Sequence, residues 1–489
     1  MSPRRAFALV ATFLVAGCAT LNAPFDQHLG SEAPQVRECA DWYRDLDEQV
    51  DMAGVRDAQD ARIAGFPYLR VSRLLADLLP RAAANEPALQ ALADRMLALD
   101  LAARRYEIMN LPSGPVLRPA EALQRTQHCG RLLRELDMAK PEARQLLLQR
   151  AQVPDDYRLG YRFFGLYALT RFAIAEGVKR YEAQMQEAFQ RELSSAGRVR
   201  HAPPPIQPLP RERVAAVLKR ASGNPLGIPE PGEAELAELL AAYAPSFDIE
   251  MKGDFDRFGA LRWPRHGKTP EVDGAQLVVY AQPAWTRYRN LVLLQLVYTI
   301  WFPERPPASP GDILAGKLDG ITWRVTLAPD GEPLVYDTIH PCGCYHQFFP
   351  TPRAQARAAP DQLEEWLFAP QALPRIAEGE RPLLRIASGT HYIERVGVVR
   401  GSDSLARYEL RPYDELRSLV RLGEPGASAF GPDGLVAGTE RPERFIFWPT
   451  GIVSAGAMRQ WGRHATAFVG RRHFDDADLF DKRFRFELE

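Results

Sequence analysis

The sequence predicts an α+β fold, in which an α-helical domain at residues 35–200 precedes a mostly antiparallel, β-rich domain at residues 213–489. Apolar residues recur every three or four positions up to about residue 190, strand-like runs dominate from residue 246, and a proline-rich segment separates the two patterns. The chain has 489 residues, of which 46% are hydrophobic and 25% are charged, values typical of a globular protein.

The helical prediction rests on several amphipathic runs. One of them places Cys39, Trp42, Tyr43, Leu46 and Val50 on a single helix face. Similar runs begin near residues 89, 122 and 163, and prolines separate them. We expect about six helices, each burying its apolar face against a neighbour.

Residues 201–212 read His-Ala-Pro-Pro-Pro-Ile-Gln-Pro-Leu-Pro-Arg-Glu. A segment this rich in proline is extended and semi-rigid. We therefore predict a linker here and a boundary between the two domains.

The second domain is expected to contain one short helix at residues 233–243 and many strands. The predicted strands cover residues 246–251, 276–280, 291–302, 321–327, 333–339, 383–387, 391–399, 407–411, 444–448 and 465–469. Residues 328–331 read Ala-Pro-Asp-Gly, so the strands on either side should form a hairpin. Residues 291–302 are nearly all apolar, which indicates a central buried strand, with a buried helix as the alternative.

The N-terminus has the pattern of a secretory signal. Arg4 and Arg5 precede an apolar run of about a dozen residues that ends at Cys18. The residues Leu14-Val15-Ala16-Gly17-Cys18 resemble the lipobox of bacterial lipoproteins. The resemblance covers about the first twenty residues and implies a signal peptide at residues 1–17, acyl chains on Cys18 and a tether at residues 18–34.

The residue after the cysteine bears on location. In such lipoproteins an Asp there favours the inner membrane, whereas this chain has Ala19. The resemblance therefore implies a protein held by lipid at the outer membrane and facing the periplasm. Several acyl chains together give a stable anchor.

The charge balance limits the partners. The formal net charge is −1, so the sequence gives no sign of a nucleic-acid surface or a polybasic membrane patch. We expect contact with a membrane through the lipid, and a partner that is another envelope protein or a small molecule.

Four cysteines besides Cys18 are present, and an oxidising compartment permits disulfides between them. Four cysteines allow three pairings, which the sequence does not decide. Cys39 and Cys129 lie on apolar helix faces, so they form either a disulfide between two helices or two buried thiols.

One segment concentrates reactive side chains: His340-Pro341-Cys342-Gly343-Cys344-Tyr345-His346. A regular strand would hold the two histidines roughly 20 Å apart, so we expect a turned loop. Three interpretations stay open. They are a zinc or copper site that uses some of His340, Cys342, Cys344 and His346, a strained Cys342–Cys344 disulfide that acts as a redox centre or a structural clip, or a buried turn. His391, His464 or His473 would complete the metal site.

Two weaker candidates are charged. Residues 471–476 read Arg-Arg-His-Phe-Asp-Asp and would suit a metal or an anion, but a solvated turn is the simpler interpretation. Asp248, Glu250, Asp254 and Asp256 form an acidic cluster, for which an exposed loop is the simpler interpretation.

No GxSxG, Walker A, GxGxxG, HExxH or CxxCH motif occurs. We therefore expect a binding or assembly role in the cell envelope. The alternative is a metal-binding or thiol-redox protein, or an enzyme, centred on residues 340–346.

Overall fold

The computed structural model describes residues 24–112, 118–360, 364–400, 406–421 and 423–488. The predicted signal peptide and Cys18 lie outside the described residues. The chain divides into two compact units. Unit 1 runs to Pro154 and includes residues 424–426, and unit 2 comprises residues 155–423 and 427–489.

The α+β class is confirmed, but the units divide at a different place from the one predicted. The division follows Pro154, whereas the proline-rich residues 203–210 lie inside unit 2, after strand β3 (Arg198–Ala202). The two helices just before β3, α8 (Leu159–Phe164) and α9 (Tyr167–Gln190), also belong to unit 2.

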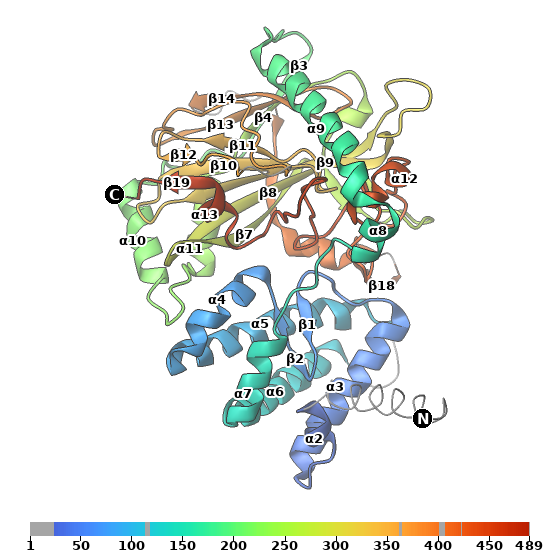
Figure 1. Cartoon of the computed structure of the whole chain (residues 1–489), viewed down its shortest axis with the longest axis vertical. Helices are drawn as coiled ribbons and strands as arrows, with labels where there is room; N and C mark the ends of the chain where they lie inside the picture. Colours follow the sequence, from blue (N-terminus) through green and yellow to red (C-terminus); the bar gives the residue numbers. More distant parts are fainter. Residues whose placement is uncertain (1–23, 113–117, 361–363, 401–405, 422, 489) are drawn as a thin grey trace, which may run out of the picture. The chain divides into compact units, whose positions relative to one another are not determined.

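Unit 1 is helical, as predicted, with one small hairpin that the periodicity did not indicate (Figure 1). Its elements are α2 (Phe25–Leu29), α3 (Pro34–Ala53), β1 (Ala61–Ile63), β2 (Phe66–Val71), α4 (Arg73–Ala83), α5 (Glu86–Asn110), α6 (Pro119–Met138) and α7 (Pro141–Arg150). Helix α2 lies in the predicted tether, and its His28 is buried against Asp137.

Buried charges hold α5 and β2 together. Arg70 donates to Asp100 Oδ1 at 3.1 Å and to Glu107 Oε1 at 2.6 Å, and Arg104 Nη1 donates to Glu107 Oε2 at 3.0 Å. All four side chains are fully buried. Each charge has an opposite partner, which burial requires.

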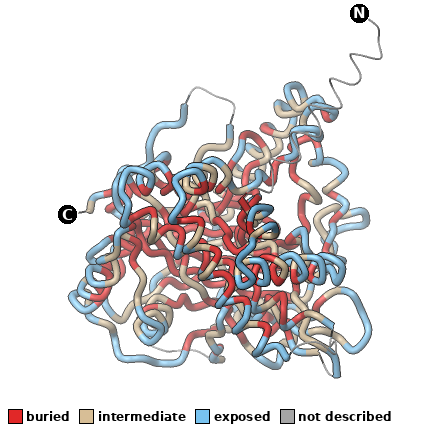
Figure 2. The backbone as a smooth tube through the Cα atoms, turned by 90° about the horizontal axis from the view of Figure 1, so that it is seen from below, coloured by how far each residue is buried: buried red, intermediate tan, exposed pale blue. Residues whose placement is uncertain are grey.

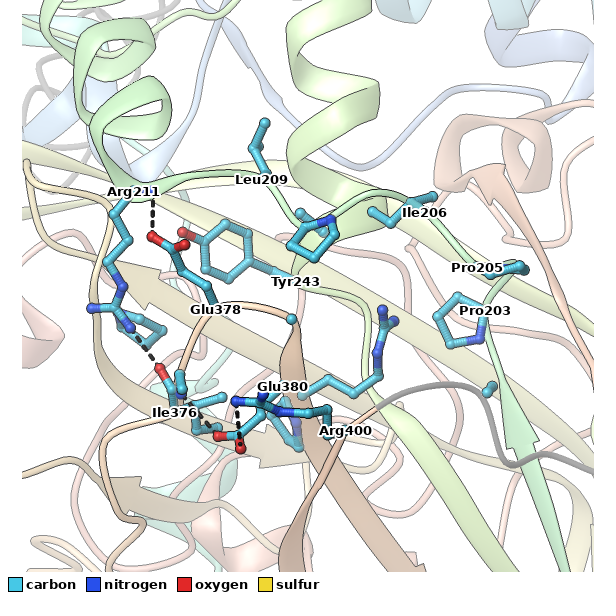
Figure 3. A pocket seen from close by; sticks show the side chains of 18 of the residues that line it. Pro203, Pro205, Ile206, Leu209, Arg211, Tyr243, Ile376, Glu378, Glu380 and Arg400 are labelled. Atoms are coloured by element: carbon cyan, nitrogen blue, oxygen red, sulfur yellow. Dashed lines mark hydrogen bonds and ion pairs between the residues drawn. The ribbon is translucent and has the colours of Figure 1, made fainter.

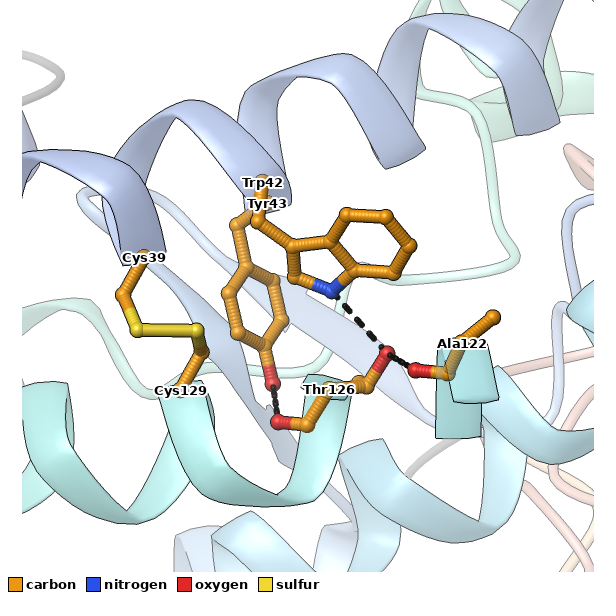
Figure 4. Close-up of a disulfide and its surroundings, with 6 residues drawn as sticks. All are labelled: Cys39, Trp42, Tyr43, Ala122, Thr126 and Cys129. Carbon is orange, nitrogen blue, oxygen red and sulfur yellow. Dashed lines mark hydrogen bonds between the residues drawn. A yellow bond between two sulfur atoms is a disulfide. The ribbon is translucent and has the colours of Figure 1, made fainter. Parts of the chain in front are cut away.

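A disulfide joins α3 to α6 (Figure 4). The Cα atoms of Cys39 and Cys129 lie 4.9 Å apart, within the reach of such a bond. Beside it, Trp42 Nε1 donates to Thr126 Oγ1 at 3.1 Å, and the Tyr43 hydroxyl donates to the Thr126 carbonyl at 3.2 Å. The structure therefore agrees with the disulfide and not with two buried free thiols.

Unit 2 contains a six-stranded sheet in the order β11-β10-β9-β8-β7-β16. These strands are β7 (Val278–Tyr288), β8 (Leu291–Arg305), β9 (Gly316–Leu327), β10 (Pro333–Ile339), β11 (Gln347–Pro350) and β16 (Glu409–Pro412). The hairpin between β9 and β10 and the central, buried position of β8 are both confirmed. All neighbours are antiparallel except β16 and β7.

A second sheet has the order β14-β13-β4-β3-β15. Its other strands are β4 (Ser246–Glu250), β13 (Glu380–Ile386), β14 (Ile393–Arg400) and β15 (Ala406–Arg407). Because β13 pairs with β4 and β15 pairs with β3 in parallel, this sheet is mixed rather than antiparallel.

One buried core contains residues of both sheets, for example Phe247, Leu296 and Trp323. Helix α9 packs Met185 and Phe189 onto this core and lies across the strands in Figure 1. Figure 2 shows the buried residues gathered inside the chain trace. None of the described helices is both long enough and apolar enough to cross a membrane.

Two predicted strands are wrong. Residues 444–448 form the short helix α12 (Arg444–Phe447) and the start of the 3-10 turn η3 (Trp448–Thr450), and residues 465–469 hold only a single bridge, from Ala465 to His473. The remaining elements are α10 (Arg211–Ala221), α11 (Glu233–Ala242), η1 (Asp254–Asp256), β5 (Ala260–Arg262), β6 (Glu271–Asp273), β12 (Ala354–Ala356), η2 (Tyr413–Arg417), β17 (Leu419–Arg421), β18 (Glu424–Ala427), α13 (Leu479–Arg483) and β19 (Phe484–Phe486).

Candidate functional site

Residues 340–346 form the tight loop between β10 and β11. The His340 N–H donates to the Cys344 carbonyl at 3.0 Å, and the Gly343 N–H donates back to the His340 carbonyl at 2.8 Å. Gly343 has φ +89°, and a Cβ there would lie 2.5 Å from the Ala465 carbonyl oxygen. The expected turn is therefore confirmed, and only glycine fits its tip.

The two histidines of this loop form hydrogen bonds with different carboxylates. His340 Nδ1 donates to Asp319 Oδ1 at 3.0 Å, and His346 Nε2 donates to Asp337 Oδ2 at 2.9 Å. Asp337 also accepts both forks of Arg324, at 2.9 and 2.6 Å. In the described parts of the chain, no group of three or more His, Cys, Asp or Glu side chains is arranged to hold a metal ion. The geometry thus gives no support to a zinc or copper site.

Cys342 and Cys344 are free, buried thiols. The hydrogen bond with Cys342 and then burial raise the pKa of Cys344 well above its usual range. A thiol that stays protonated is a poor nucleophile. The structure therefore agrees with the third interpretation of this segment, a buried turn in which the two cysteines are not bonded to each other.

Asp319 on β9 is the centre of a buried network. It accepts from His340 on one oxygen and from His391 Nδ1 on the other, at 2.9 Å. His391 Nε2 lies 3.5 Å from Asp256 Oδ1, so two carboxylates flank this ring. Burial disfavours the charged forms of Asp319 and His391. Their contacts with oppositely charged groups nevertheless hold the pKa of Asp319 well below its usual range and raise the pKa of His391.

Strained backbone surrounds this network. Leu318, Tyr345 and His391 have φ of 53°, 63° and 52°, although none of them is glycine. Such residues persist where the surrounding structure compensates for their strain, and they cluster at functional sites. Three of them next to one network point to this part of unit 2.

A cavity of about 610 Å³ lies in unit 2 beside the network. Tyr345, Tyr392 and Glu443 border it, and α9 supplies one series of wall residues. The apolar part of the wall comprises Ala173, Ile174, Val178, Met185, Leu314, Leu367, Phe368, Ile446, Phe447 and Phe468. The volume suits a small ligand. The rest of the wall is mostly polar and includes the charged residues Arg180, Glu182, Glu365, Glu443 and Arg472.

Three acids border the cavity, Glu182, Glu365 and Glu443, and burial raises the pKa of each. The most buried of them is Glu443. Its side chain is buried, and Oε1 has no hydrogen-bond partner. Burial raises the pKa of Glu443 to about 7, with Arg441 and Arg305 opposing the shift. A Cβ at Gly456, where φ is +85°, would lie 2.1 Å from Oε1, so glycine leaves the room that this carboxyl needs. Near neutral pH Glu443 can therefore accept or donate a hydrogen bond to a ligand.

Three tyrosines, Tyr181, Tyr345 and Tyr392, also border the cavity. Tyr345 and Tyr392 lie in edge contact at 4.8 Å between ring centroids, and Arg305 Nη1 donates to the Tyr392 hydroxyl at 3.2 Å. Tyr181 on α9 accepts from Gln347 at 3.2 Å. Burial raises the pKa of Tyr181, Tyr345 and Tyr392, so all three hydroxyls stay protonated and can donate.

The weaker sequence candidates lie elsewhere. His464 is buried, which lowers its pKa to about 3, and His473 lies 3.4 Å from Asp156 and 3.5 Å from Asp476. Of the acidic cluster, only Asp256 joins the network. Its oxygens accept from Ser388 Oγ and the Gly389 N–H, both at 2.8 Å, whereas Asp254 is exposed.

A second cavity, of about 320 Å³, is formed partly by the proline-rich segment (Figure 3). Arg211 donates from its backbone N–H to Glu378 at 2.9 Å and from its side chain to the Ile376 carbonyl at 2.5 Å. Arg400 pairs with Glu380 at 3.4 Å. The lining of this cavity thus holds three arginines, Arg211, Arg381 and Arg400, and two acids, Glu378 and Glu380.

Sequence reasoning found His340, His346 and His391 but missed Asp319, Glu443 and the tyrosines. These residues come from segments far apart in the chain, and no local pattern connects them. No protein-family model, curated protein or solved structure matches this chain, so the function has to be argued from the site.

Proposed function

We propose that this protein is a lipid-anchored envelope protein whose unit 2 binds an amphipathic small molecule in the cavity beside Glu443. The cavity is the observation that carries the proposal. Its apolar walls suit a hydrocarbon or aromatic body, and the ligand's hydroxyl or amine group would meet the polar side formed by Tyr345, Tyr392 and Glu443.

The disulfide in unit 1 supports the proposed location. The Cys39–Cys129 disulfide is typical of an oxidising compartment, and such bonds are rare in the bacterial cytosol. Together with the lipobox resemblance, the disulfide favours a position at the outer membrane, facing the periplasm, with Cys18 as the acylated residue.

Filling the cavity tests ligand binding. Gly177 on α9 borders the cavity, and a Cβ there meets nothing within 4 Å. Gly177→Phe should therefore fold normally and occupy the ligand's space, whereas Gly177→Ala should leave the space open. The probe is N-phenyl-1-naphthylamine, an apolar amine that fluoresces in apolar surroundings. We expect the wild type and Gly177→Ala to bind it with similar affinity and Gly177→Phe to lose on the order of tenfold.

Two results would contradict ligand binding. One is that Gly177→Phe binds the probe with the same affinity as the wild type. The other is that the wild type does not increase the fluorescence of the probe. Fractionation tests the location separately: the wild type should sediment with outer membranes and carry acyl chains on Cys18. A Cys18→Ser protein that still carries acyl chains would refute the anchor.

A further inference from the structure

A surface rich in aromatic residues lies where α8, the start of α9 and α12 meet, all in unit 2. We call it the aromatic surface and define it by Phe163, Phe164, Leu169, Phe172, Phe445 and Trp448. Phe163 and Phe164 are 76% and 77% exposed, and Phe445 is 69% exposed. Soluble monomers rarely expose so many large apolar side chains together, and such a surface is typical of a binding site.

The two segments form one continuous surface. Arg162 Nε donates to the Thr450 carbonyl at 2.7 Å, and the Arg158 N–H donates to the Gly451 carbonyl at 2.9 Å. Gly165 packs against Pro449 so closely that a Cβ would lie 2.6 Å from it. Figure 1 shows α8 and α12 side by side. The exposed rings of both segments are therefore held on one rigid support.

The segments that carry this surface are basic, and acids flank them at Asp155, Asp156, Glu176 and Glu443. Residues 157–175 and 444–456 contain four arginines and no Asp or Glu. The guanidinium of Arg171 lies 5.3 Å from the Phe172 ring centre, and that of Arg444 lies 4.7 Å from the Phe445 ring centre. A chain with a net charge of −1 thus carries a locally basic, aromatic face, which its overall composition concealed.

We infer that the aromatic surface docks on a lipid bilayer that contains anionic phospholipid. Aromatic rings enter the interface between headgroups and acyl chains, and arginines at the same depth pair with phosphates. The charge complementarity favours anionic lipid as the occupant over a second copy of this chain, whose own surface would repel it. The inference does not depend on the lipid on Cys18, because it uses only residues of unit 2.

Vesicle co-sedimentation tests the inference with the chain from Pro24 onward, which retains every described helix and strand and lacks Cys18. We expect it to sediment with vesicles of phosphatidylcholine and phosphatidylglycerol, far less with phosphatidylcholine alone, and less as salt increases. The variant Phe163→Ser/Phe164→Ser/Phe445→Ser should lose on the order of tenfold in partitioning. Arg171→Gln/Arg444→Gln should lose the preference for phosphatidylglycerol.

The matched control is Val420→Ser, which removes an 87% exposed apolar side chain outside the aromatic surface and should bind as the wild type does. Circular dichroism checks that each variant is folded. The inference is overturned if the triple variant sediments like the wild type. It is likewise overturned if the wild type binds neither kind of vesicle, or binds both kinds equally. It is also overturned if light scattering finds a wild-type dimer that the triple variant abolishes, since a second copy would then cover the surface.

Discussion

Asp337 shows how a single buried carboxylate organises the centre of unit 2. It accepts two hydrogen bonds from Arg324 and one from His346, and both acid and guanidinium are almost fully buried. Despite burial, Arg324 and His346 hold the pKa of Asp337 below its usual range, so it is ionised at neutral pH. The pair fixes β9 against β10 beneath the loop at residues 340–346.

Removing that charge should be costly. Asp337→Asn leaves the Arg324 guanidinium buried without its counter-charge, so we expect a loss of about 3–5 kcal/mol in the free energy of unfolding, measured with urea. Asp94, whose side chain is 63% exposed, pairs with Arg134 at 2.8 Å on the surface of unit 1. Asp94→Asn is the matched control and should cost less than about 1 kcal/mol. Equal effects of the two substitutions would contradict this role for Asp337.

Glu443 should make stability depend on pH. Its pKa is about 4.5 in an unfolded chain and about 7 in the folded protein, so the folded state binds the extra proton between these values. The contribution of Glu443 is fully present below pH 4.5 and is lost as the pH rises to about 7. We expect this loss to be on the order of 2–3 kcal/mol.

The measurement compares urea unfolding of the wild type and Glu443→Gln across that pH range. The variant cannot ionise at this position, so its free energy of unfolding should decline less between these pH values. Arg441, Arg305, Asp319 and Cys344 surround the carboxyl in both proteins and contribute equally to the two curves. Parallel curves would show that the carboxyl titrates normally.

The disulfide between α3 and α6 is the main covalent constraint described in unit 1. It joins residues 90 positions apart, and closing a loop of that length in the unfolded chain accounts for about 4–5 kcal/mol in the chain-entropy model. We expect Cys39→Ala/Cys129→Ala to lower the stability of unit 1 by about 2–5 kcal/mol, measured by thermal unfolding.

Reductant provides the control for that measurement. It should destabilise the wild type and Cys342→Ala/Cys344→Ala alike, and leave Cys39→Ala/Cys129→Ala unchanged. If reductant destabilised Cys39→Ala/Cys129→Ala but not Cys342→Ala/Cys344→Ala, the bond would instead join Cys342 and Cys344 in unit 2.

The strands predicted best from the sequence are those that are buried on one face or on both faces. The apolar run 291–302 and the hairpin around Asp330 and Gly331 follow directly from strand periodicity and turn chemistry, and both occur. The prediction failed at residues 444–448, where Phe and Ile favour a strand only if a sheet covers them. In the structure these side chains are exposed on a short helix, so no sheet neighbour determines their conformation.

The division of the whole chain was harder to predict than its class. Proline content suggested a boundary at residues 201–212, but these prolines pack as the wall of a cavity inside unit 2. Helix α9 looked like the rest of the helical region because periodicity does not say which partner a helix has. Its Met185 and Phe189 belong to the core of the two sheets, which only the tertiary structure shows.

The candidate site was predictable only in part for the same reason. The loop at residues 340–346 was found because its reactive residues are adjacent in sequence. Asp319, His391 and Glu443 are separated by tens of residues and come together only when β9, the turn before β14 and the residue before α12 approach one another. Contacts between distant segments leave no trace in spacing.

The position of Cys129 sets an order of events during biogenesis. Helix α3 is synthesised first, but its thiol at Cys39 has no partner until ninety further residues have been added to the chain. During that interval the nascent segment is held by noncovalent packing alone. The helix bundle of unit 1 therefore gains its covalent link between α3 and α6 only after more than a hundred residues have been synthesised.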